Sequence, residues 1–205
     1  MESFWDKCFR YDFEKLFKRK GYAYFTNGRY NLNIIGVRRK VHDNEITDKF
    51  DDYLVLIYKT QNREVRRLYS ITTEPGYYYM VKQLLNKKGT AILVPGQYRG
   101  CWQIGKHKGK YKALVQVKPV KVYRDNNKDK VYNMNPKTID TGVFGINIHR
   151  SKEFGSSDKI DRWSAGCQVF KIAEEFKSFM KICEEQSKLY GNSFTYTLIN
   201  EEDMV

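Results

Sequence analysis

The chain has 205 residues, a length that suits one domain, or one domain with a small appendage. Hydrophobic residues make up 41% of it, enough for an ordinary buried core, and no apolar run approaches the length of a membrane span. Its formal charge of +13, from 37 Lys and Arg against 24 Asp and Glu, predicts attraction to polyanions: nucleic acid first, and the anionic polymers of a bacterial wall second.

The cysteine spacing and the N-terminal residues give further information on metal binding and cellular location. The four cysteines, at positions 8, 101, 167 and 183, lack the C-x-x-C spacing of a metal site, so we predict neither a metal nor a cofactor. The first residues lack the basic segment and the apolar segment of a secretory signal. We therefore expect cytoplasmic synthesis, no membrane span and reduced thiols.

The N-terminal part is predicted to contain a helix and a hairpin. Apolar residues recur at spacings of three and four over residues 3–20, which predicts an amphipathic helix capped by Ser3 and stopped by Gly21. Asn27-Gly28 is a hairpin signal between two strand-like runs in residues 22–37. We expect residues 1–50 to pack as a unit on a catalytic domain formed by residues 51–205.

The remainder of the chain is predicted to be rich in strands. Alternating, β-branched and aromatic runs indicate strands at 53–58, 65–72, 90–94, 100–104, 112–122, 143–148 and 194–199. A short helix is expected at 81–85, a solvated turn at 125–129, a long amphipathic helix at 172–190 and a frayed acidic tail at 201–205. The fold class is therefore mainly β (α+β): a mostly antiparallel core with a helix at each end.

One short motif carries most of the functional information. Ser164-Ala165-Gly166-Cys167 places a thiol on a turn of small residues, and His149 lies upstream at the predicted end of a strand. An imidazole takes the proton of a thiol and later returns it to a leaving amine. Backbone N–H groups around Gly166 and Cys167 would bind the oxyanion, and a helix beginning there would lower the pKa of the thiol.

The same residues resemble a known family. Gly145-Ile146-Asn147-Ile148-His149 followed by Ser164-Ala165-Gly166-Cys167 is similar to the active-site signature of the L,D-transpeptidases, which have the YkuD-like β-sandwich fold. The specific resemblance covers about residues 142–170 and a looser one covers 53–199. Residues 94–98, Val-Pro-Gly-Gln-Tyr, loosely resemble an element that precedes the catalytic region in that family.

The resemblance implies a role for each matching residue. Cys167 would be the nucleophile, His149 its base, Gly166 a backbone contact to the oxyanion, and Ser164 the residue that orders the loop. The implied reaction is acyl transfer on peptidoglycan stem peptides through a thioester. Transfer to an amine would be transpeptidation, and transfer to water would be peptide cleavage.

Two departures from the family pattern concern the substrate. Ala165 stands where many members have a second histidine, and Val169 where many have an arginine that shapes the pocket. Arg150 and Arg162 are candidates to supply the missing charge. Trp163 is a candidate wall of the substrate groove or an anchor of the loop.

The other reactive side chains are assigned structural or exposed positions. We expect His107 and His42 to be exposed in turns, Cys8 and Cys183 to lie in the core, and Cys101 to lie in a strand away from the site. The aromatic run Tyr77-Tyr78-Tyr79 fits either a peptide groove or sheet packing.

Two other functional interpretations remain beside the enzyme. The first is a basic β-domain that binds nucleic acid or serves a structural purpose, without catalytic activity, since the charge of +13 accompanies many Tyr and Phe. The second keeps the fold and the thiol but changes the substrate to a non-wall peptide or nucleotide conjugate. For the wall enzyme, the missing signal favours a phage-encoded protein that is released to the cell wall during lysis or carried in a virion.

Overall fold

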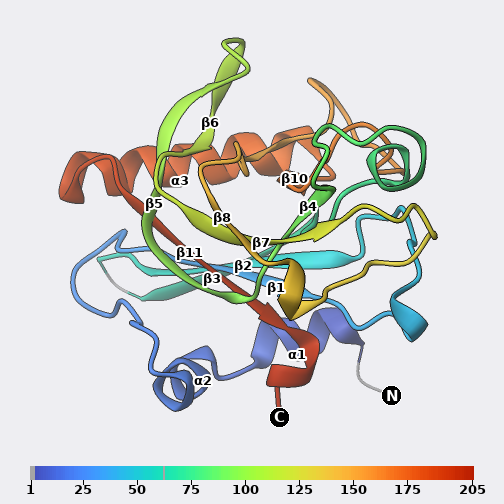
Figure 1. Ribbon diagram of the computed structural model, residues 1–205. Coiled ribbons are helices and arrows are strands. Elements are labelled where there is room, and N and C mark those ends of the chain that lie inside the picture. Colours follow the sequence, from blue (N-terminus) through green and yellow to red (C-terminus); the bar gives the residue numbers. More distant parts are fainter. Residues whose placement is uncertain (1–2, 62) are drawn as a thin grey trace.

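The computed structural model describes residues 3–61 and 63–205, and its fold is mainly β (Figure 1). A closed barrel is formed, in hydrogen-bonded order, by β1 (Asn33–Arg38), β11 (Phe194–Asn200), β5 (Gly96–His107), β6 (Tyr111–Gln116), β9 (Ile148–Arg150), β10 (Gln168–Phe170), β3 (Glu64–Thr72) and β2 (Asp52–Lys59). A 3-stranded sheet contains β4 (Thr90–Leu93), β7 (Val120–Asp125) and β8 (Asp140–Gly142). The pairs β1–β11 and β9–β10 are parallel, and the other strand pairs are antiparallel.

In the described residues, the α-helices are α1 (Phe4–Arg10), α2 (Phe13–Lys20) and α3 (Ala173–Tyr190). The two short N-terminal helices lie on the same side of the molecule as both chain ends, and α3 crosses the opposite side (Figure 1). No helix in the described ranges is both long and apolar enough to cross a membrane.

The expected single helix over residues 3–20 is wrong in one respect, because the chain breaks at Tyr11. This residue is extended, with φ −62° and ψ 143°, and Asp12 starts a new helix by accepting a hydrogen bond from the N–H of Lys15 at 3.0 Å. The predicted ends are confirmed: Ser3 caps α1, and Gly21 ends α2 with a φ of 68°. A good internal cap has therefore divided an amphipathic stretch into two helices.

The predicted hairpin around Asn27-Gly28 does not form, since residues 22–30 contain no strand. Side-chain amides satisfy the backbone there instead. Asn33 bonds both the N–H and the C=O of Phe25, at 2.8 and 2.9 Å. Gln97 does the same for Ala23, at 2.9 and 2.8 Å. The true partners of β1 are β2 and the C-terminal strand β11, so the first fifty residues contribute a strand to the barrel.

Two further strand predictions are corrected. The run 112–122 is divided between β6 and β7, which lie in different sheets; the division falls before Pro119, which has no N–H to donate. The strand expected at 143–148 begins only at Ile148, and His149 lies in its middle rather than at its end. Before it, the side chain of Gln116 accepts the N–H groups of Phe144 and Ile146, at 3.0 and 2.9 Å, in place of a neighbouring strand.

Smaller differences concern the turns and the C-terminus. The short helix near 81–85 is a π-helical turn at Tyr78–Lys82. Asp125, expected in a solvated turn, instead ends β7, is buried and accepts the N–H of Asn133 at 2.8 Å. Residues 126–129 are exposed as expected. The acidic tail is not frayed: residues 201–203 form a 3-10 turn, and Asp203 lies 2.6 Å from the ammonium of Lys20.

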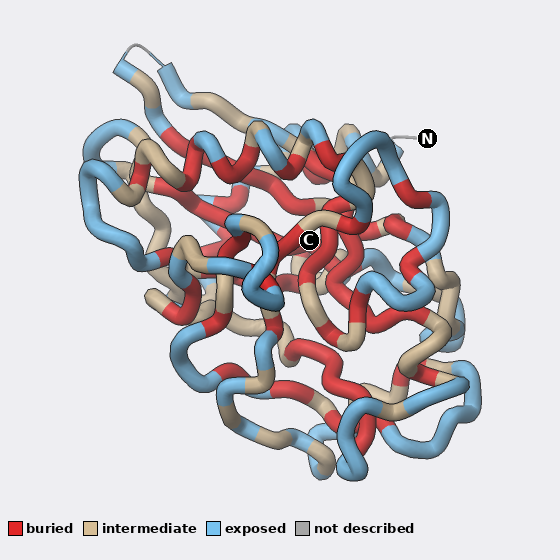
Figure 2. The backbone as a smooth tube through the Cα atoms, turned by 90° about the horizontal axis from the view of Figure 1, so that it is seen from above, coloured by how far each residue is buried: buried red, intermediate tan, exposed pale blue. Residues whose placement is uncertain are grey.

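Strands β1 and β2 are buried on both faces, which explains their continuous apolar runs. Their alternate residues Ile34, Leu54 and Leu56 pack in the cluster that also contains Trp102, Tyr196 and the apolar face of α3. The intervening residues Ile35, Val37, Val55 and Ile57 pack against α1 and α2. Buried backbone therefore runs through the middle of the molecule, and exposed backbone lies at its margin (Figure 2).

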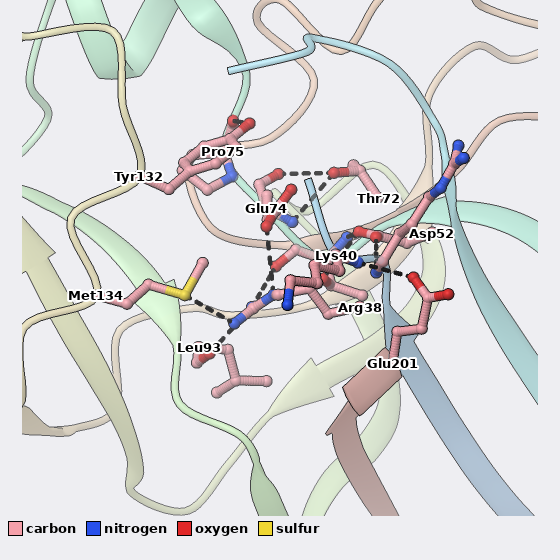
Figure 3. A network of polar contacts seen from close by, with 12 residues as sticks. Arg38, Lys40, Asp52, Thr72, Glu74, Pro75, Leu93, Tyr132, Met134 and Glu201 are labelled. Atoms are coloured by element: carbon pink, nitrogen blue, oxygen red, sulfur yellow. Dashed lines mark hydrogen bonds and ion pairs between the residues drawn. The ribbon is translucent and has the colours of Figure 1, made fainter. Parts of the chain in front are cut away.

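A buried polar network ties the barrel to the 3-stranded sheet (Figure 3). The guanidinium of Arg38 donates to the carbonyl of Thr73 at 3.1 Å and to the carbonyl of Leu93, in β4, at 3.0 Å. Asp52 accepts the N–H and the hydroxyl of Thr73, at 2.7 and 2.9 Å. Glu74, beside them, lies 3.5 Å from Arg38. This network fixes the position of Thr73 and Glu74, which directly follow β3.

Candidate active site

The structure brings Cys167 and His149 to one cavity of about 530 Å³. His149 is the central residue of β9, and Cys167 immediately precedes the parallel neighbour β10. The register pairs Gln168 with Ile148 and Val169 with His149, which places Cys167 beside Asn147. Side chains alternate along a strand, so Cys167, Asn147 and His149 share one face of the sheet.

The thiol of Cys167 is half-buried and protonated. It donates a hydrogen bond to the carbonyl of Gly145 at 3.3 Å. Burial raises its pKa to about 11, although the backbone N–H of Asn147 and the charge of Lys108 oppose that shift. No helix begins at Cys167: β10 follows this residue, and α3 starts at Ala173, within one residue of the predicted start at 172. No helix dipole therefore lowers the pKa of the thiol.

The imidazole of His149 is oriented by the backbone. Its Nδ1 lies 2.8 Å from the carbonyl of Arg150, an acceptor, so the proton is on Nδ1 and Nε2 is a free acceptor. The hydroxyl of Tyr111 lies 3.3 Å from the same Nδ1. Burial, followed by the neighbouring His107, lowers the pKa of His149 to about 3, which keeps the ring neutral at physiological pH.

No hydrogen bond joins the thiol and the imidazole in the described part of the chain, because the thiol turns towards Gly145. A rotation about one side-chain bond of Cys167 redirects the sulfur without moving the backbone. Catalytic hydrogen bonds are often long or misaligned without substrate and tighten when it binds. The arrangement is therefore compatible with a nucleophile and base that engage on substrate binding.

Ser164 orders the turn before Cys167. Its buried hydroxyl donates to the carbonyl of Cys167 at 2.8 Å and accepts the N–H of Gly166 at 3.1 Å. Its own carbonyl accepts the N–H of Gly76 at 2.9 Å, which attaches the turn to the segment after β3. Gly166 has a φ of 120°, and a Cβ at this position would collide with the carbonyl of Ala91.

The expected oxyanion site is corrected in part by these contacts. The N–H of Gly166 is already used by Ser164, so it is not an open donor. The N–H of Cys167 has no hydrogen bond to any described residue and is the open donor of the pair. Among the described residues, one backbone donor of the pair is therefore open rather than two.

The three candidate substrate-binding residues fall into two groups. Arg162 and Trp163 line the cavity that holds Cys167, with the Arg162 guanidinium 3.9 Å above the ring of Tyr78 and Trp163 41% exposed. Arg150 does not line that cavity. It stacks on Tyr111 at 4.2 Å and lies 3.6 Å from Glu153. Of these two arginines, Arg162 therefore lines the same cavity as Cys167 and Arg150 does not.

His107 is the main functional residue that the sequence did not reveal. We expected it to be exposed in a turn, but it is 6% exposed, and its ring stacks on that of His149 with centroids 4.0 Å apart. The pairing of His107 with Tyr111 at the end of the β5–β6 hairpin turns it towards the site. Asn147 was also missed, although its place two residues before His149 was a usable signal for a shared strand face.

The remaining cysteines lie outside the cavity. Cys8 and Cys183 are buried in two different apolar clusters, as expected, and Cys101 is buried beside Trp102. Within the described residues, no group of three or more His, Cys, Asp and Glu side chains is placed to hold a metal ion.

The cavity that holds Cys167 is basic. Its lining includes Lys108, Arg124 and Arg162 and no described Asp or Glu. Arg124 is committed to Asp140 at 3.2 Å, whereas Lys108 and Arg162 have no carboxylate within salt-bridge distance among the described residues. Two cations without a carboxylate partner among the described residues, Lys108 and Arg162, therefore line the same cavity as the thiol.

Comparison of the chain with protein-family models, with curated proteins and with solved structures gives no match. The interpretation of the site consequently depends on the geometry of Cys167 and His149, on the turn at Ser164 and on the charge of the cavity.

Proposed function

We propose that the protein is a cysteine acyl-transfer enzyme of the L,D-transpeptidase type, acting on peptidoglycan stem peptides through a thioester on Cys167. The observation that carries the proposal is that Cys167 and His149 line one cavity from neighbouring parallel strands, with Nδ1 of His149 held by a carbonyl and Nε2 free. The order of the matching motifs supports the assignment to an L,D-transpeptidase-like fold. Transpeptidation and peptide cleavage differ only in the second acceptor.

The proposed reaction has two halves. As the sulfur of Cys167 attacks the substrate carbonyl carbon, the thiol proton passes to Nε2 of His149. The amide C–N bond breaks, the imidazolium gives its proton to the leaving amine, and a thioester remains. An amine or a water then attacks the thioester and gives a proton to His149, and the departing thiolate recovers that proton.

The resting site uses general-base catalysis rather than a preformed ion pair. A thiol whose burial raises its pKa to about 11 does not transfer its proton spontaneously to an imidazole whose pKa burial lowers to about 3. The proton moves only as the carbon–sulfur bond forms, when sulfur loses its basicity. This protects a free thiol from oxidation between turnovers, because the thiolate is the reactive form.

The positive charge of the cavity predicts that the substrate carries a negatively charged group. Lys108 and Arg162 would bind a carboxylate of the acyl donor, and Trp163 would cover its apolar part. We expect Arg162→Gln to raise KM for a donor with a free carboxylate and to have little effect on the matching carboxamide. Arg99→Gln is a control for general charge, since Arg99 does not line the cavity.

The experiment that tests the function is product analysis by mass spectrometry after incubation with defined stem peptides, with and without an amine acceptor. Cleaved or exchanged peptide is expected from the wild-type protein and from Cys101→Ala, and none from Cys167→Ala. Product from Cys167→Ala at the wild-type rate would refute the proposal.

The alternative function, a basic binding domain without catalysis, is favoured by one observation. The β5–β6 hairpin projects beyond the rest of the barrel (Figure 1), and its end carries Lys106, Lys108 and Lys110. Salt-dependent binding of single-stranded DNA that is lost on charge reversal at these lysines, without peptide turnover, would support this alternative.

A further inference from the structure

His107 and His149 form a stacked pair whose members come from different parts of the chain. His107 ends β5 and His149 lies in β9, and β6 is hydrogen-bonded between these two strands. The ring centroids lie 4.0 Å apart and the planes are inclined by 22°, so the rings lie face to face. Both side chains are buried, at 6% and 3% exposure. His107 thus packs on the face of the His149 ring, and the carbonyl of Arg150 contacts Nδ1 at the edge of the same His149 ring.

The protonation of His107 follows from an adjacent amide. The backbone N–H of Gln116 donates to Oδ1 of Asn147 at 2.9 Å, which identifies that atom as the oxygen. The other amide atom, Nδ2, lies 3.0 Å from Nδ1 of His107 and must be the donor. Nδ1 of His107 is therefore an unprotonated acceptor, and the proton of this ring is on Nε2.

The two histidines consequently have opposite tautomers. His149 carries its proton on Nδ1, facing a carbonyl, and His107 carries its proton on Nε2. If Nδ1 of His107 were protonated, it would face the side-chain N–H of Asn147. Two hydrogen-bond donors would then oppose each other, which is unfavourable. His107 is thereby prevented from taking a second proton at Nδ1, and its ring stays neutral while His149 cycles.

We propose that His107 is a positioning residue for His149: its neutral ring, anchored by Asn147, is the platform that holds the base with Nε2 free to receive the thiol proton. This proposal rests on the proposed function only where it calls His149 a base. The tautomers and the stacking are properties of the resting protein.

The surroundings of the pair agree with this role. The charged or titratable groups that face it are Lys108 beside the hairpin turn, Tyr111 from β6, Arg150 after His149 and Cys167 before β10. The two cations among them oppose protonation of either ring. Besides burial, His107 itself also lowers the pKa of His149, so both rings are neutral in the resting protein.

The test is nitrogen-15 NMR of histidine-labelled protein, which reports which ring nitrogen carries the proton. The chain has three histidines, and the exposed His42 is assigned by its loss in His42→Gln. We expect the signal lost in His149→Gln to be protonated at Nδ1 and the signal lost in His107→Phe to be protonated at Nε2. This measurement on the wild-type protein needs no variant to be active.

Two variants of His107 distinguish the effect of its stacked ring from the effect of its ring nitrogens. His107→Phe keeps a stacked ring but loses the hydrogen bond from Asn147, so we expect the tautomer of His149 to be retained and kcat to fall less than in His107→Leu. His107→Leu removes the ring plane, so His149 should exchange between tautomers and kcat should fall by about a hundred-fold, as misplacement of a catalytic group does, with KM unchanged.

Each outcome decides the proposal. A proton on Nδ1 of His107, or a His107→Leu protein in which both kcat and the tautomer of His149 are unchanged, would overturn it. If the tautomers are as expected and His107→Leu disturbs His149, but the wild-type protein forms no thioester, then the proposed function fails and the positioning of His149 by His107 stands.

Discussion

At the scale of single residues, the environment of Cys167 decides how the protein would react with thiol reagents. Only the thiolate is alkylated, and burial raises the pKa of this thiol to about 11. We predict slow labelling of Cys167 by iodoacetamide at pH 6, with a rate that rises about tenfold per pH unit until the pKa is approached. Intact-mass measurements from pH 6 to pH 9 check this. Fast labelling at pH 6 that requires His149 would mean a preformed thiolate–imidazolium pair instead.

The lowered pKa of His149 predicts how peptide turnover depends on pH in the acid range. An imidazole with the usual pKa of 6.5 would be mostly protonated at pH 5 and unable to act as a base, whereas burial lowers the pKa of His149 to about 3. We predict that peptide turnover at pH 5 remains close to its value at pH 7. A pH profile of kcat/KM that declines below an apparent pKa near 6.5 would show that His149 is not the buried base described here.

Part of the candidate site at this scale was predictable from sequence, because Ser164, Gly166 and Cys167 lie together in one short motif. Ser164 and Gly166 were identified from the motif, and their contacts agree with the ordering of a turn. His107 was not identifiable, since its stacking on His149 depends on the pairing of β6 with the distant strand β9. The use of the Gly166 N–H by Ser164 was equally hidden, because a motif does not specify which donor is already occupied.

At the scale of secondary-structure elements, side-chain amides replace strand partners at several places. Gln97 bonds the backbone of Ala23, and Asn33 bonds that of Phe25. Gln116 accepts the N–H groups of Phe144 and Ile146. Each segment has the apolar and aromatic composition of a strand, and sequence patterns respond to that composition. Such patterns do not distinguish a ladder of backbone partners from one well-placed amide.

Gln116 offers the clearest test of this substitution of amides for strands. Its Oε1 accepts two backbone N–H groups, and its Nε2 donates to the carbonyls of Lys118 and Gly142, both at 2.9 Å. We predict that Gln116→Ala lowers the free energy of unfolding by about 2 kcal/mol, because buried backbone groups lose their partners. Equal urea midpoints for the wild-type protein and Gln116→Ala would contradict this.

Elements with a long uninterrupted pattern were predicted well. The strands β2, β3 and β11 and the helix α3 agree with the sequence within two residues at each end, since their apolar residues face a core on at least one side throughout. The short strands β9 and β10, which carry the site, were not predictable as parallel neighbours. Three residues hold too little pattern to specify a partner.

At the scale of the whole molecule, the buried network around Arg38 joins the two sheets, and its carboxyl groups give stability a pH dependence. Burial raises the pKa of Asp52 from 3.8 to about 6. The folded protein therefore holds a proton that the unfolded chain has lost between these pH values, and the free energy of unfolding declines as pH rises through that window.

Asp52→Asn removes this titration while keeping most of the shape of the side chain. We predict that the difference in unfolding free energy between the wild-type protein and Asp52→Asn changes by on the order of 2 kcal/mol between pH 4 and pH 7, in favour of the variant at pH 7. Urea denaturation at the two pH values measures it, and His149, which has the opposite sign, cancels in the difference. A difference that does not change with pH would mean that Asp52 titrates as an exposed carboxyl.

The proposed reaction requires one covalent intermediate, a thioester on Cys167. Two parallel strands present a thiol and an oriented imidazole to a basic cavity, and acyl transfer by this pair must pass through a thioester on Cys167. The most direct measurement is rapid-quench intact mass of the protein mixed with a stem peptide that bears a free carboxylate. We predict an added acyl mass on Cys167 that is absent in Cys167→Ala and strongly reduced in His149→Gln. Peptide turnover without any acylated protein, or an adduct located on Cys8, Cys101 or Cys183, would contradict the assignment of this site as an acyl-transfer centre.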